Sequence, residues 1–327
     1  MENKENYVTP IHFLKNMSKK NNIYIKREDL YPFSFGGNKV KIGKEFLKDA
    51  LNKKCDTIIS YGSYISNLNR AIVSLCKKYN LECFIVSPNT NEKEIFNYNK
   101  RLNLLNIPEE NIYKCSKDNV ASTLKKLIEE LTLRGKKTYY INGNIYGEGN
   151  EKIAVSAYEK CYREILEYEL NNNIYFDCIF LATGTGMTQS GLILGKIKSN
   201  NKDRRIIGIS VAREKKQGIE AIKKYLKSSL TDEVLEEEKV EFLDQYTIGG
   251  YGKFNKELLQ KISEVYQNEG IPLDIIYTGK AFYGMEKYLE EENIQGKNIL
   301  FLHTGGTPLF FNSIGYLEKN LEADKNE

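Results

Sequence analysis

The chain has 327 residues, with 48 Lys and Arg against 44 Asp and Glu, which gives a formal net charge of +4. A chain of this length exceeds the roughly 250–300 residues at which a single hydrophobic core usually stops growing, so two domains are expected. The 41% hydrophobic and 28% charged residues are typical of a globular protein and exclude a disordered or collagen-like chain. The balanced charge argues against nucleic-acid binding, and no apolar run approaches the roughly 18 residues that a membrane span needs.

The N-terminal stretch and the cysteines indicate the compartment. Residues Met1 to Asn6 include no apolar segment, so no signal peptide is predicted and a cytoplasmic location is expected. The six cysteines form no C-x-x-C pair in a chain too long to need disulfide bonds, so free, structural thiols are expected. With only His12 and His303 in the whole chain, no metal site is expected.

Short apolar runs alternate with amphipathic stretches along the chain. Strands are predicted at 56–60, 83–86, 138–141, 177–181, 205–211 and 298–302, and helices at 67–79, 121–133 and 151–170. This alternation predicts an α/β fold whose sheets are parallel and covered by helices on both faces.

Four loops carry candidate catalytic or binding residues, and the first is Phe35-Gly36-Gly37-Asn38-Lys39. The two glycines allow a sharp turn that delivers a lysine to the start of the next helix. A lysine amine buried beside apolar groups loses its proton more easily and can then form a Schiff base. The alternative is that Lys39 is a solvated surface cation.

The second loop runs from Ser60 to Asn67 between a predicted strand and a predicted helix. Ser66 or Asn67 would be the N-cap of that helix, where backbone N–H groups point outward and can hold a substrate carboxylate. An ordinary helix cap without a ligand is the alternative.

The third loop, Ala182 to Gly191, follows a buried strand and precedes an apolar helix. Its glycines and threonines predict a phosphate cradle at the positive end of the helix, with Gly184 supplying backbone angles that other residues avoid. No lysine follows the second glycine as in a P-loop, and no G-x-G-x-x-G is present. A nicotinamide dinucleotide is therefore not expected.

The fourth loop, His303-Thr304-Gly305-Gly306, also follows a predicted strand. Ligands of open α/β sheets bind at the carboxyl ends of the strands, so the four loops are expected to converge on one cleft.

These motifs, together with Tyr277-Thr-Gly-Lys-Ala281, occur in the order seen in one family. The chain resembles the D-cysteine desulfhydrase / 1-aminocyclopropane-1-carboxylate (ACC) deaminase family, pyridoxal-phosphate (PLP) enzymes of the tryptophan synthase β fold (fold type II). The resemblance implies two open, twisted, mostly parallel sheets flanked by helices. It also implies a larger PLP-binding domain of residues 1–47 and 151–327, a smaller domain of residues 48–150, an active site in the cleft between them, and a homodimer.

The resemblance further implies roles for individual residues. Lys39 would form the Schiff base with PLP, Ser66 would lie beside the substrate carboxylate and α-carbon, and Tyr277 would project into the site. Asn67 would face the phenolate oxygen of PLP. Thr278 would lie at the pyridine nitrogen, and Thr304 would line the pocket. The phosphate would be held by the loop Thr183, Gly184, Thr185, Gly186, Met187 and Thr188.

Three departures from the family pattern concern the substrate more than the cofactor. Met187 stands where a further glycine is usual, and Ile65 replaces a polar residue beside Ser66 and Asn67. The stretch after Lys39 is one residue longer than expected, which leaves open whether Lys41 or Lys44 supplies the usual nearby cation.

The implied function is β-elimination on a small amino acid, with D-cysteine converted to pyruvate, ammonia and hydrogen sulfide. ACC deaminases tend to carry Glu where this chain has Thr278, and Leu where it has Thr304; both threonines favour elimination over ring opening, unless they are only small packing residues. Lys39, Ser66 and Tyr277 remain alternative bases. ACC deamination, β-replacement synthesis, racemisation and a PLP-free binding protein are the alternative functions.

Overall fold

The computed structural model describes residues 7–88 and 97–325, and the stretch Met1 to Asn6 lies outside them. The chain contacts divide it into two units. The large unit comprises Met1–Asn38 and Ala157–Glu327, and the small unit comprises Lys39–Ser156. The predicted α/β class with two mostly parallel sheets is confirmed, since each unit is built on one open sheet.

The large unit contains a six-stranded sheet with strand order β1-β2-β10-β7-β8-β9. Only β1 is antiparallel to its neighbour; the remaining strands pair in parallel, as expected for strands joined by helices. The strands are β1 (Ile11–Phe13), β2 (Asn22–Arg27), β7 (Cys178–Thr183), β8 (Arg205–Ser210), β9 (Glu241–Leu243) and β10 (Asn298–His303).

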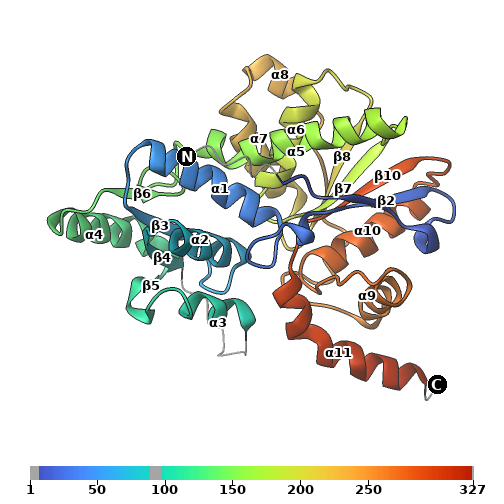
Figure 1. Cartoon of the computed structure of the whole chain (residues 1–327). Coiled ribbons are helices and arrows are strands. Elements are labelled where there is room, and N and C mark those ends of the chain that lie inside the picture. Colours follow the sequence, from blue (N-terminus) through green and yellow to red (C-terminus); the bar gives the residue numbers. More distant parts are fainter. Residues whose placement is uncertain (1–6, 89–96, 326–327) are drawn as a thin grey trace. The chain divides into compact units, whose positions relative to one another are not determined.

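Helices cover both faces of this sheet (Figure 1). On one face, α10 packs Phe282 against Phe301 of β10, with ring centroids 5.1 Å apart, and α9 and α11 extend the same core. The opposite face is covered by α5 and α6. The helices are α5 (Glu151–Asn172), α6 (Met187–Lys198), α7 (Lys215–Lys227), α8 (Asp232–Glu237), α9 (Lys256–Glu269), α10 (Thr278–Glu291) and α11 (Thr307–Lys325), with short 3-10 turns η1 (Lys15–Met17) and η2 (Glu28–Leu30).

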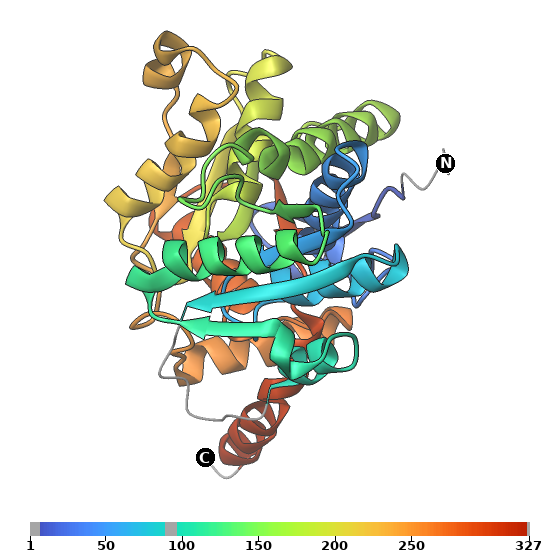
Figure 2. The same ribbon diagram turned by 90° about the vertical axis from the view of Figure 1, so that its left-hand side faces the viewer.

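The small unit contains a four-stranded parallel sheet with strand order β5-β4-β3-β6. Figure 2 shows α4 lying along this sheet, where its Leu124, Leu127 and Leu131 pack against Ile59 and Phe84. The elements are α1 (Asn38–Asn52), β3 (Thr57–Tyr61), α2 (Asn67–Lys78), β4 (Glu82–Pro88), α3 (Tyr98–Leu104), η3 (Glu109–Asn111), β5 (Ile112–Cys115), η4 (Lys117–Asn119), α4 (Val120–Leu133) and β6 (Thr138–Tyr140).

The predicted strands differ from the observed ones by one or two residues at their ends, and β4 is the clearest case. The strand predicted to end at Val86 continues through Ser87 and Pro88, and Pro88 pairs with Cys115 of β5. Proline is tolerated there because it is the last residue of the strand, where its missing N–H interrupts no further pairing.

Two further expectations concern free cysteine thiols and membrane-spanning helices. All six cysteines are free thiols, as expected, and five of them are buried. Among the described residues, no helix combines the length and the apolar character that crossing a membrane requires.

Close packing between α5 and α6 depends on Gly195. A Cβ at this position would lie 2.5 Å from Cβ and 2.7 Å from Cγ of Tyr162, whereas a Cβ on Gly315 of α11 would meet nothing within 4 Å. We expect Gly195→Ala to destabilise the protein by about 1–3 kcal/mol through overpacking. The matched control Gly315→Ala should stabilise it by about 0.5–1 kcal/mol, because alanine favours an exposed helix. Thermal unfolding followed by circular dichroism distinguishes them; equal melting temperatures would contradict the packing argument.

Candidate functional site

The turn that precedes Lys39 has an unusual backbone. All four residues of the segment 34–37 have left-handed φ values, from 44° to 96°. A Cβ on Gly36 would stand 2.2 Å from the carbonyl oxygen of Asp29, so only glycine fits against that backbone. Such a run of left-handed residues is unfavourable by itself and persists because surrounding contacts hold it.

Three hydrogen bonds hold the end of this turn. The backbone N–H of Gly37 donates to Glu28 O (2.7 Å), and that of Asn38 donates to Thr304 O (3.0 Å). The Asn38 side-chain amide donates to Thr188 Oγ1 (2.9 Å). The residue before the lysine is thus fixed to both the 183–188 loop and the 303–306 loop.

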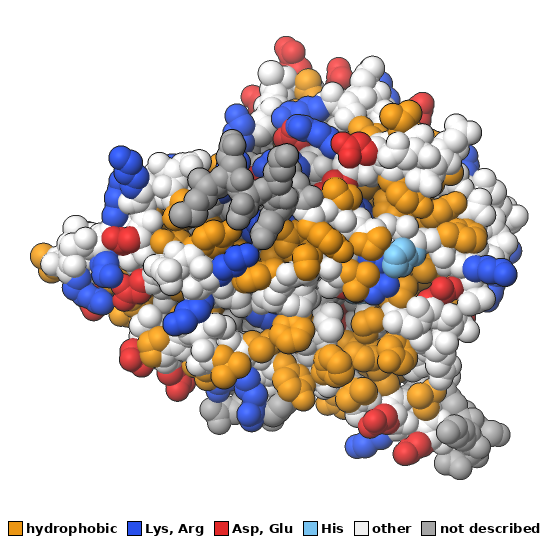
Figure 3. All heavy atoms as spheres, viewed as in Figure 1, with side chains coloured by type: hydrophobic (Ala, Val, Ile, Leu, Met, Phe, Trp, Pro, Cys, Tyr) orange, Lys and Arg blue, Asp and Glu red, His pale blue; other side chains and the backbone are white. Residues whose placement is uncertain are grey.

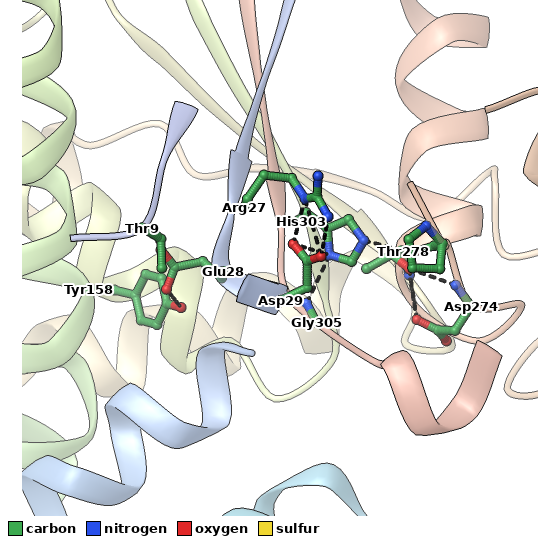
Figure 4. Close-up of polar contacts among 10 residues, drawn as sticks. Thr9, Arg27, Glu28, Asp29, Tyr158, Asp274, Thr278, His303 and Gly305 are labelled. Atoms are coloured by element: carbon green, nitrogen blue, oxygen red, sulfur yellow. Dashed lines mark hydrogen bonds and ion pairs between the residues drawn. The ribbon is translucent and has the colours of Figure 1, made fainter. Parts of the chain in front are cut away.

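The segment that supports the turn is itself fixed by buried charges (Figure 4). The Glu28 carboxylate accepts hydrogen bonds from Thr9 Oγ1 (2.5 Å) and from the hydroxyl of Tyr158 (2.9 Å). The Arg27 guanidinium pairs with Asp29, with Nη2 2.7 Å from Oδ2. Buried polar groups that are fully paired favour one arrangement, so the platform beneath the glycine turn is rigid.

Lys39 is the second residue of α1 and is partly buried. Desolvation lowers the pKa of its amine from 10.5 to about 8. No hydrogen bond joins its Nζ to any of the described residues. About a tenth of such an amine is neutral at pH 7, far more than for a lysine with a pKa of 10.5. This makes Lys39 a more competent nucleophile than a solvated surface cation.

The 183–188 loop joins β7 to the N-terminus of α6. Gly186 is the N-cap, with φ 94° and no side-chain capping hydrogen bond. Gly184, by contrast, does not have a left-handed φ, and a Cβ there would make only ordinary contacts with Val211 (3.6 Å) and Tyr277 (3.9 Å). The special backbone angles expected at Gly184 therefore occur at Gly186 instead.

The side chains of this loop do not all point the same way. Thr183 Oγ1 donates to the buried Gln189 Oε1 (2.9 Å), so its proton is used inside the protein. Met187 is only 5% exposed and its side chain lies in the interior, which is how a bulky residue is tolerated in the loop. Thr185 is exposed, and Thr188 accepts from Asn38 and keeps its own proton to donate.

These features fit a phosphate group. The first N–H groups of α6 lack intrahelical acceptors, and the helix end is positive. The space beside Gly184 and the free hydroxyl proton of Thr188 complete an open cradle for an anion. Backbone N–H groups from Thr185 to Thr188 are the groups that would hold a phosphate.

Ser66, one of the two predicted candidates, is the N-cap of α2, and its hydroxyl accepts from the backbone N–H of Asn69 (3.1 Å). Asn67 begins the helix, and its Oδ1 accepts from Asn99 Nδ2 (2.9 Å). The hydroxyl proton of Ser66 and the amide N–H groups of Asn67 thus remain available as donors. Donors at a helix N-terminus suit a carboxylate or a phenolate oxygen.

A group of asparagines shapes this loop, and the sequence analysis did not identify them. Buried Asn69 accepts from Ser60 Oγ (2.6 Å) and donates to the carbonyls of Gly62 (3.0 Å) and Ser63 (2.8 Å). Asn103 of α3 donates to Tyr64 O (2.6 Å). The recurrence of asparagine on α3 was a weak signal that could have pointed to loop-holding amides.

Tyr277 precedes α10, and its hydroxyl lies 3.0 Å from that of Tyr251. Burial, followed by the proximity of Tyr251, raises the pKa of Tyr277 well above its ordinary value. The phenol therefore stays protonated near neutral pH and suits hydrogen-bond donation better than proton abstraction. Tyr251 was missed from the sequence, although its position among three glycines was an available signal.

Thr278 faces a buried carboxylate. Its hydroxyl donates to Asp274 Oδ2 (2.8 Å) and accepts from the Asp274 N–H (2.8 Å). Asp274 also accepts from the N–H groups of Ile276 (2.9 Å), Tyr277 (2.8 Å) and Thr278 (3.2 Å). Because its only proton is already donated, Thr278 can do no more than accept a hydrogen bond from a ligand.

Thr304 differs from Thr278 in the use of its hydroxyl proton. Its backbone carbonyl accepts from Asn38, but its hydroxyl bonds to none of the described residues and keeps its proton. The loop around it is fixed by His303, whose Nε2 contacts Pro272 O (2.8 Å) and whose Nδ1 accepts from Gly305 N (3.2 Å). Figure 4 shows this histidine beside the Arg27 and Asp29 pair.

The structure thus brings together several predicted residues within each unit. In the large unit, Asn38 contacts both Thr188 and Thr304, and Tyr277 lies beside Gly184. In the small unit, Ser66 and Asn67 form the start of α2.

Comparisons with known proteins agree with this chemistry. A family model described as "Pyridoxal-phosphate dependent enzyme" matches residues 3–305. A provisionally named ACC deaminase of Pyrococcus horikoshii is 33% identical over 91% of this chain and 89% of its own length. A D-cysteine desulfhydrase of Serratia proteamaculans is 29% identical over 93% and 92%. The crystal structure of an ACC deaminase homologue, 32% identical, superposes with a TM-score of 0.80 over 96% of this chain and 94% of that one.

The lowered pKa of Lys39 predicts how capture of the cofactor aldehyde depends on pH. Only the neutral amine attacks an aldehyde, so the rate at which PLP-free protein gains visible absorbance should rise with pH and reach half its maximum at about pH 8. A midpoint near 10.5 would contradict the burial of this amine. Lys39→Ala should give no borohydride-sensitive absorbance at any pH, and retention of that absorbance would place the covalent link elsewhere.

Gly184 offers a matched test of the anion cradle. Gly184→Ala needs no special backbone angle and has room, so its PLP affinity should stay close to that of the parent protein. Gly184→Asp brings a negative charge to the same place and should weaken PLP binding by about fivefold or more, since like charges at close range cost about 1 kcal/mol or more. Equal PLP affinity in the two variants, measured by fluorescence titration, would show that the phosphate binds elsewhere.

Proposed function

Since this chain belongs to the pyridoxal-phosphate-dependent enzyme family, we propose that it is a lyase that removes a β-substituent from a small amino acid, most closely a D-cysteine desulfhydrase. The net reaction converts D-cysteine and water to pyruvate, ammonia and hydrogen sulfide. The cofactor is pyridoxal 5′-phosphate, which supplies an electron sink for the bonds of the α-carbon when it is bound. The proposal assigns roles to residues of both units.

The amine of Lys39 carries the cofactor and then serves as the base for the α-proton. Its pKa of about 8 supports this choice, because a base acts best when its pKa lies near the working pH. The raised pKa of Tyr277 argues against a tyrosinate base at neutral pH. Tyr277, with Tyr251 at 3.0 Å, instead donates a hydrogen bond toward the departing substituent.

Ser66 and the N-terminus of α2 bind the substrate carboxylate. The Ser66 hydroxyl keeps its proton to donate, and the positive helix end favours an anion. Asn67 donates its amide to the phenolate oxygen of the cofactor, since its own oxygen is already paired with Asn99. Backbone N–H groups of the 183–188 loop hold the phosphate.

We choose β-elimination over ring opening because of the hydrogen-bonding groups that are available to the pyridine nitrogen of the cofactor. Thr278 already donates its only hydroxyl proton in a hydrogen bond to Asp274, whereas the hydroxyl of Thr304 donates to none of the described residues. We therefore assign the nitrogen contact, expected at Thr278, to Thr304. A neutral hydroxyl does not hold a proton on the ring nitrogen, so the electron sink is a weak one.

The carboxylate beside Thr278, that of Asp274, does not change this conclusion. Asp274 is buried, and three backbone N–H groups and one hydroxyl donate to it. Those four donors offset its charge locally, and its oxygens have no spare direction toward a ligand. A weak sink suffices when a thiolate leaves after α-proton loss. Opening a cyclopropane ring that has no α-proton demands more, which is why ACC deamination is the second candidate.

The proposal keeps the expectation of a homodimer. Exposed apolar side chains gather over α9 and α11 (Figure 3), and they include Tyr266, Phe311, Ile314 and Tyr316, each at least 41% exposed. Large apolar side chains clustered on a surface favour association with another protein surface.

Substrate preference tests the proposal directly. Purified PLP-loaded protein should release pyruvate from D-cysteine or β-chloro-D-alanine, and should form 2-oxobutanoate from ACC much more slowly. Thr304→Val removes the hydroxyl at nearly constant volume and should lower kcat for elimination by about 5- to 10-fold, the loss of one hydrogen bond. Thr278→Ser keeps the hydroxyl on Asp274 and serves as the control. Faster ammonia release from ACC than from every β-substituted amino acid would overturn the assignment.

A further inference from the structure

Two consecutive turns make up the glycine-rich segment that carries Tyr251. The backbone N–H of Gly250 donates to Thr247 O (3.2 Å), and that of Lys253 donates to Gly250 O (3.3 Å). Each bond closes a four-residue turn, so Gly250 ends the first turn and begins the second. We call the segment 247–253 the tyrosine loop.

The first of these turns contains a strained residue. Its two central residues, Ile248 and Gly249, have φ values of 52° and 79°. Two left-handed central residues are the pattern of a type I′ turn, in which asparagine and glycine are preferred at both positions. A β-branched isoleucine in this conformation is a true outlier and persists only where other contacts enforce it.

The enforcing contact comes from Lys280 of α10. This side chain is 0% exposed, and its Nζ donates to Thr247 O (2.8 Å) and Gly250 O (2.5 Å). These two carbonyls belong to the first residue of each turn. One ammonium group therefore clamps both turns at the atoms that also accept their closing hydrogen bonds.

We propose that Lys280 is a positioning residue that fixes the tyrosine loop so that the hydroxyl of Tyr251 meets that of Tyr277. Tyr277 immediately precedes α10, and Lys280 is the third residue of the same helix. Both tyrosines are thus connected to α10. Tyr277 immediately precedes this helix in the chain, and the loop that carries Tyr251 is hydrogen-bonded to Lys280 of the same helix. Its effect on catalysis rests on the proposed function; its effect on the loop does not.

The charge state of Lys280 suits this task. Burial lowers the pKa of the amine to about 8, and the nearby Asp274 carboxylate opposes that shift. At neutral pH the ammonium form therefore predominates, with three protons for hydrogen bonding. Its acceptors are uncharged carbonyls, so the clamp does not depend on a neighbouring carboxylate for its geometry.

The chain has no tryptophan, which allows a single reporter on the loop. Tyr251 is 53% exposed, so Tyr251→Trp places one fluorophore there without crowding the core. In this background, Lys280→Met should lower the fluorescence anisotropy of the indole and increase its quenching by acrylamide. Lys261→Met, which removes a paired lysine from neighbouring α9, is the control and should leave both values unchanged. Unchanged anisotropy in a folded Lys280→Met variant would overturn the proposal.

A second variant separates the clamp from a general effect on folding. Ile248→Asn relieves the left-handed strain, because asparagine tolerates that conformation. Added to Lys280→Met, it should restore part of the lost anisotropy. If Lys280→Met does not fold, Lys280→Gln, which retains an N–H donor, should fold and give an intermediate anisotropy. The clamp would be contradicted if Ile248→Asn restored none of the lost anisotropy. It would also be contradicted if the Lys280→Gln variant were as rigid as the parent protein or as mobile as an unfolded chain.

The catalytic arm uses the PLP-loaded enzyme with the native Tyr251. Lys280→Met should retain the visible absorbance of the bound cofactor, while kcat for β-chloro-D-alanine falls about 10- to 100-fold with little change in KM, as expected when a reacting group is misplaced. An unchanged kcat would overturn the link to catalysis. If the parent enzyme releases no pyruvate at all, the proposed function fails, and the fluorescence experiments alone decide the clamp.

Discussion

The close approach of two backbone segments organises the part of the large unit that ends at Asn38. Gly36 lies against the carbonyl of Asp29 so tightly that a Cβ would stand 2.2 Å from that oxygen. This contact explains why the preceding residues adopt left-handed conformations, and why buried Glu28 and Asp29 carry so many partners: a platform that moved would release the turn. The position of Asn38 is a consequence of this packing.

Three helix N-termini show how capping chemistry decides which ligand a helix end accepts. Ser66 caps α2 with a neutral hydroxyl that still has a proton to donate. Asp274 lies before α10 and accepts from its first N–H groups, so an incoming anion would meet a carboxylate there. Gly186 caps α6 with no side chain at all, which leaves the N–H groups and the positive helix end unsatisfied. Of these three ends, α6 is the one whose chemistry calls for a phosphate.

Local pattern was sufficient to predict six of the ten described strands and part of the described helices, and to narrow the cap of α2 to Ser66 or Asn67, because strand runs, helix periodicity and capping residues are encoded within a few positions. It was insufficient for side-chain direction. The sequence around Thr183 does not show that its hydroxyl turns inward to Gln189, or that Met187 is buried. The partnership of Thr278 with Asp274 spans only four residues, yet it was missed because threonine after tyrosine was interpreted through the ligand alone. Contacts such as Gly36 with Asp29 depend on the packing of the whole unit and leave no local signature.

Lys39 and Lys280 show why a lowered pKa does not by itself identify a reactive lysine. Desolvation brings the pKa of both amines to about 8, so both have similar neutral fractions. Their hydrogen bonds differ: Lys280 donates to two loop carbonyls, whereas Nζ of Lys39 bonds to none of the described residues. An amine must release a proton and turn its lone pair toward an electrophile in order to react, and each hydrogen bond that it donates to the protein opposes that change. Lys39 donates no hydrogen bond to the described residues and follows a rigid turn, and both features favour chemistry at this amine. The two hydrogen bonds that Lys280 donates favour a structural role instead.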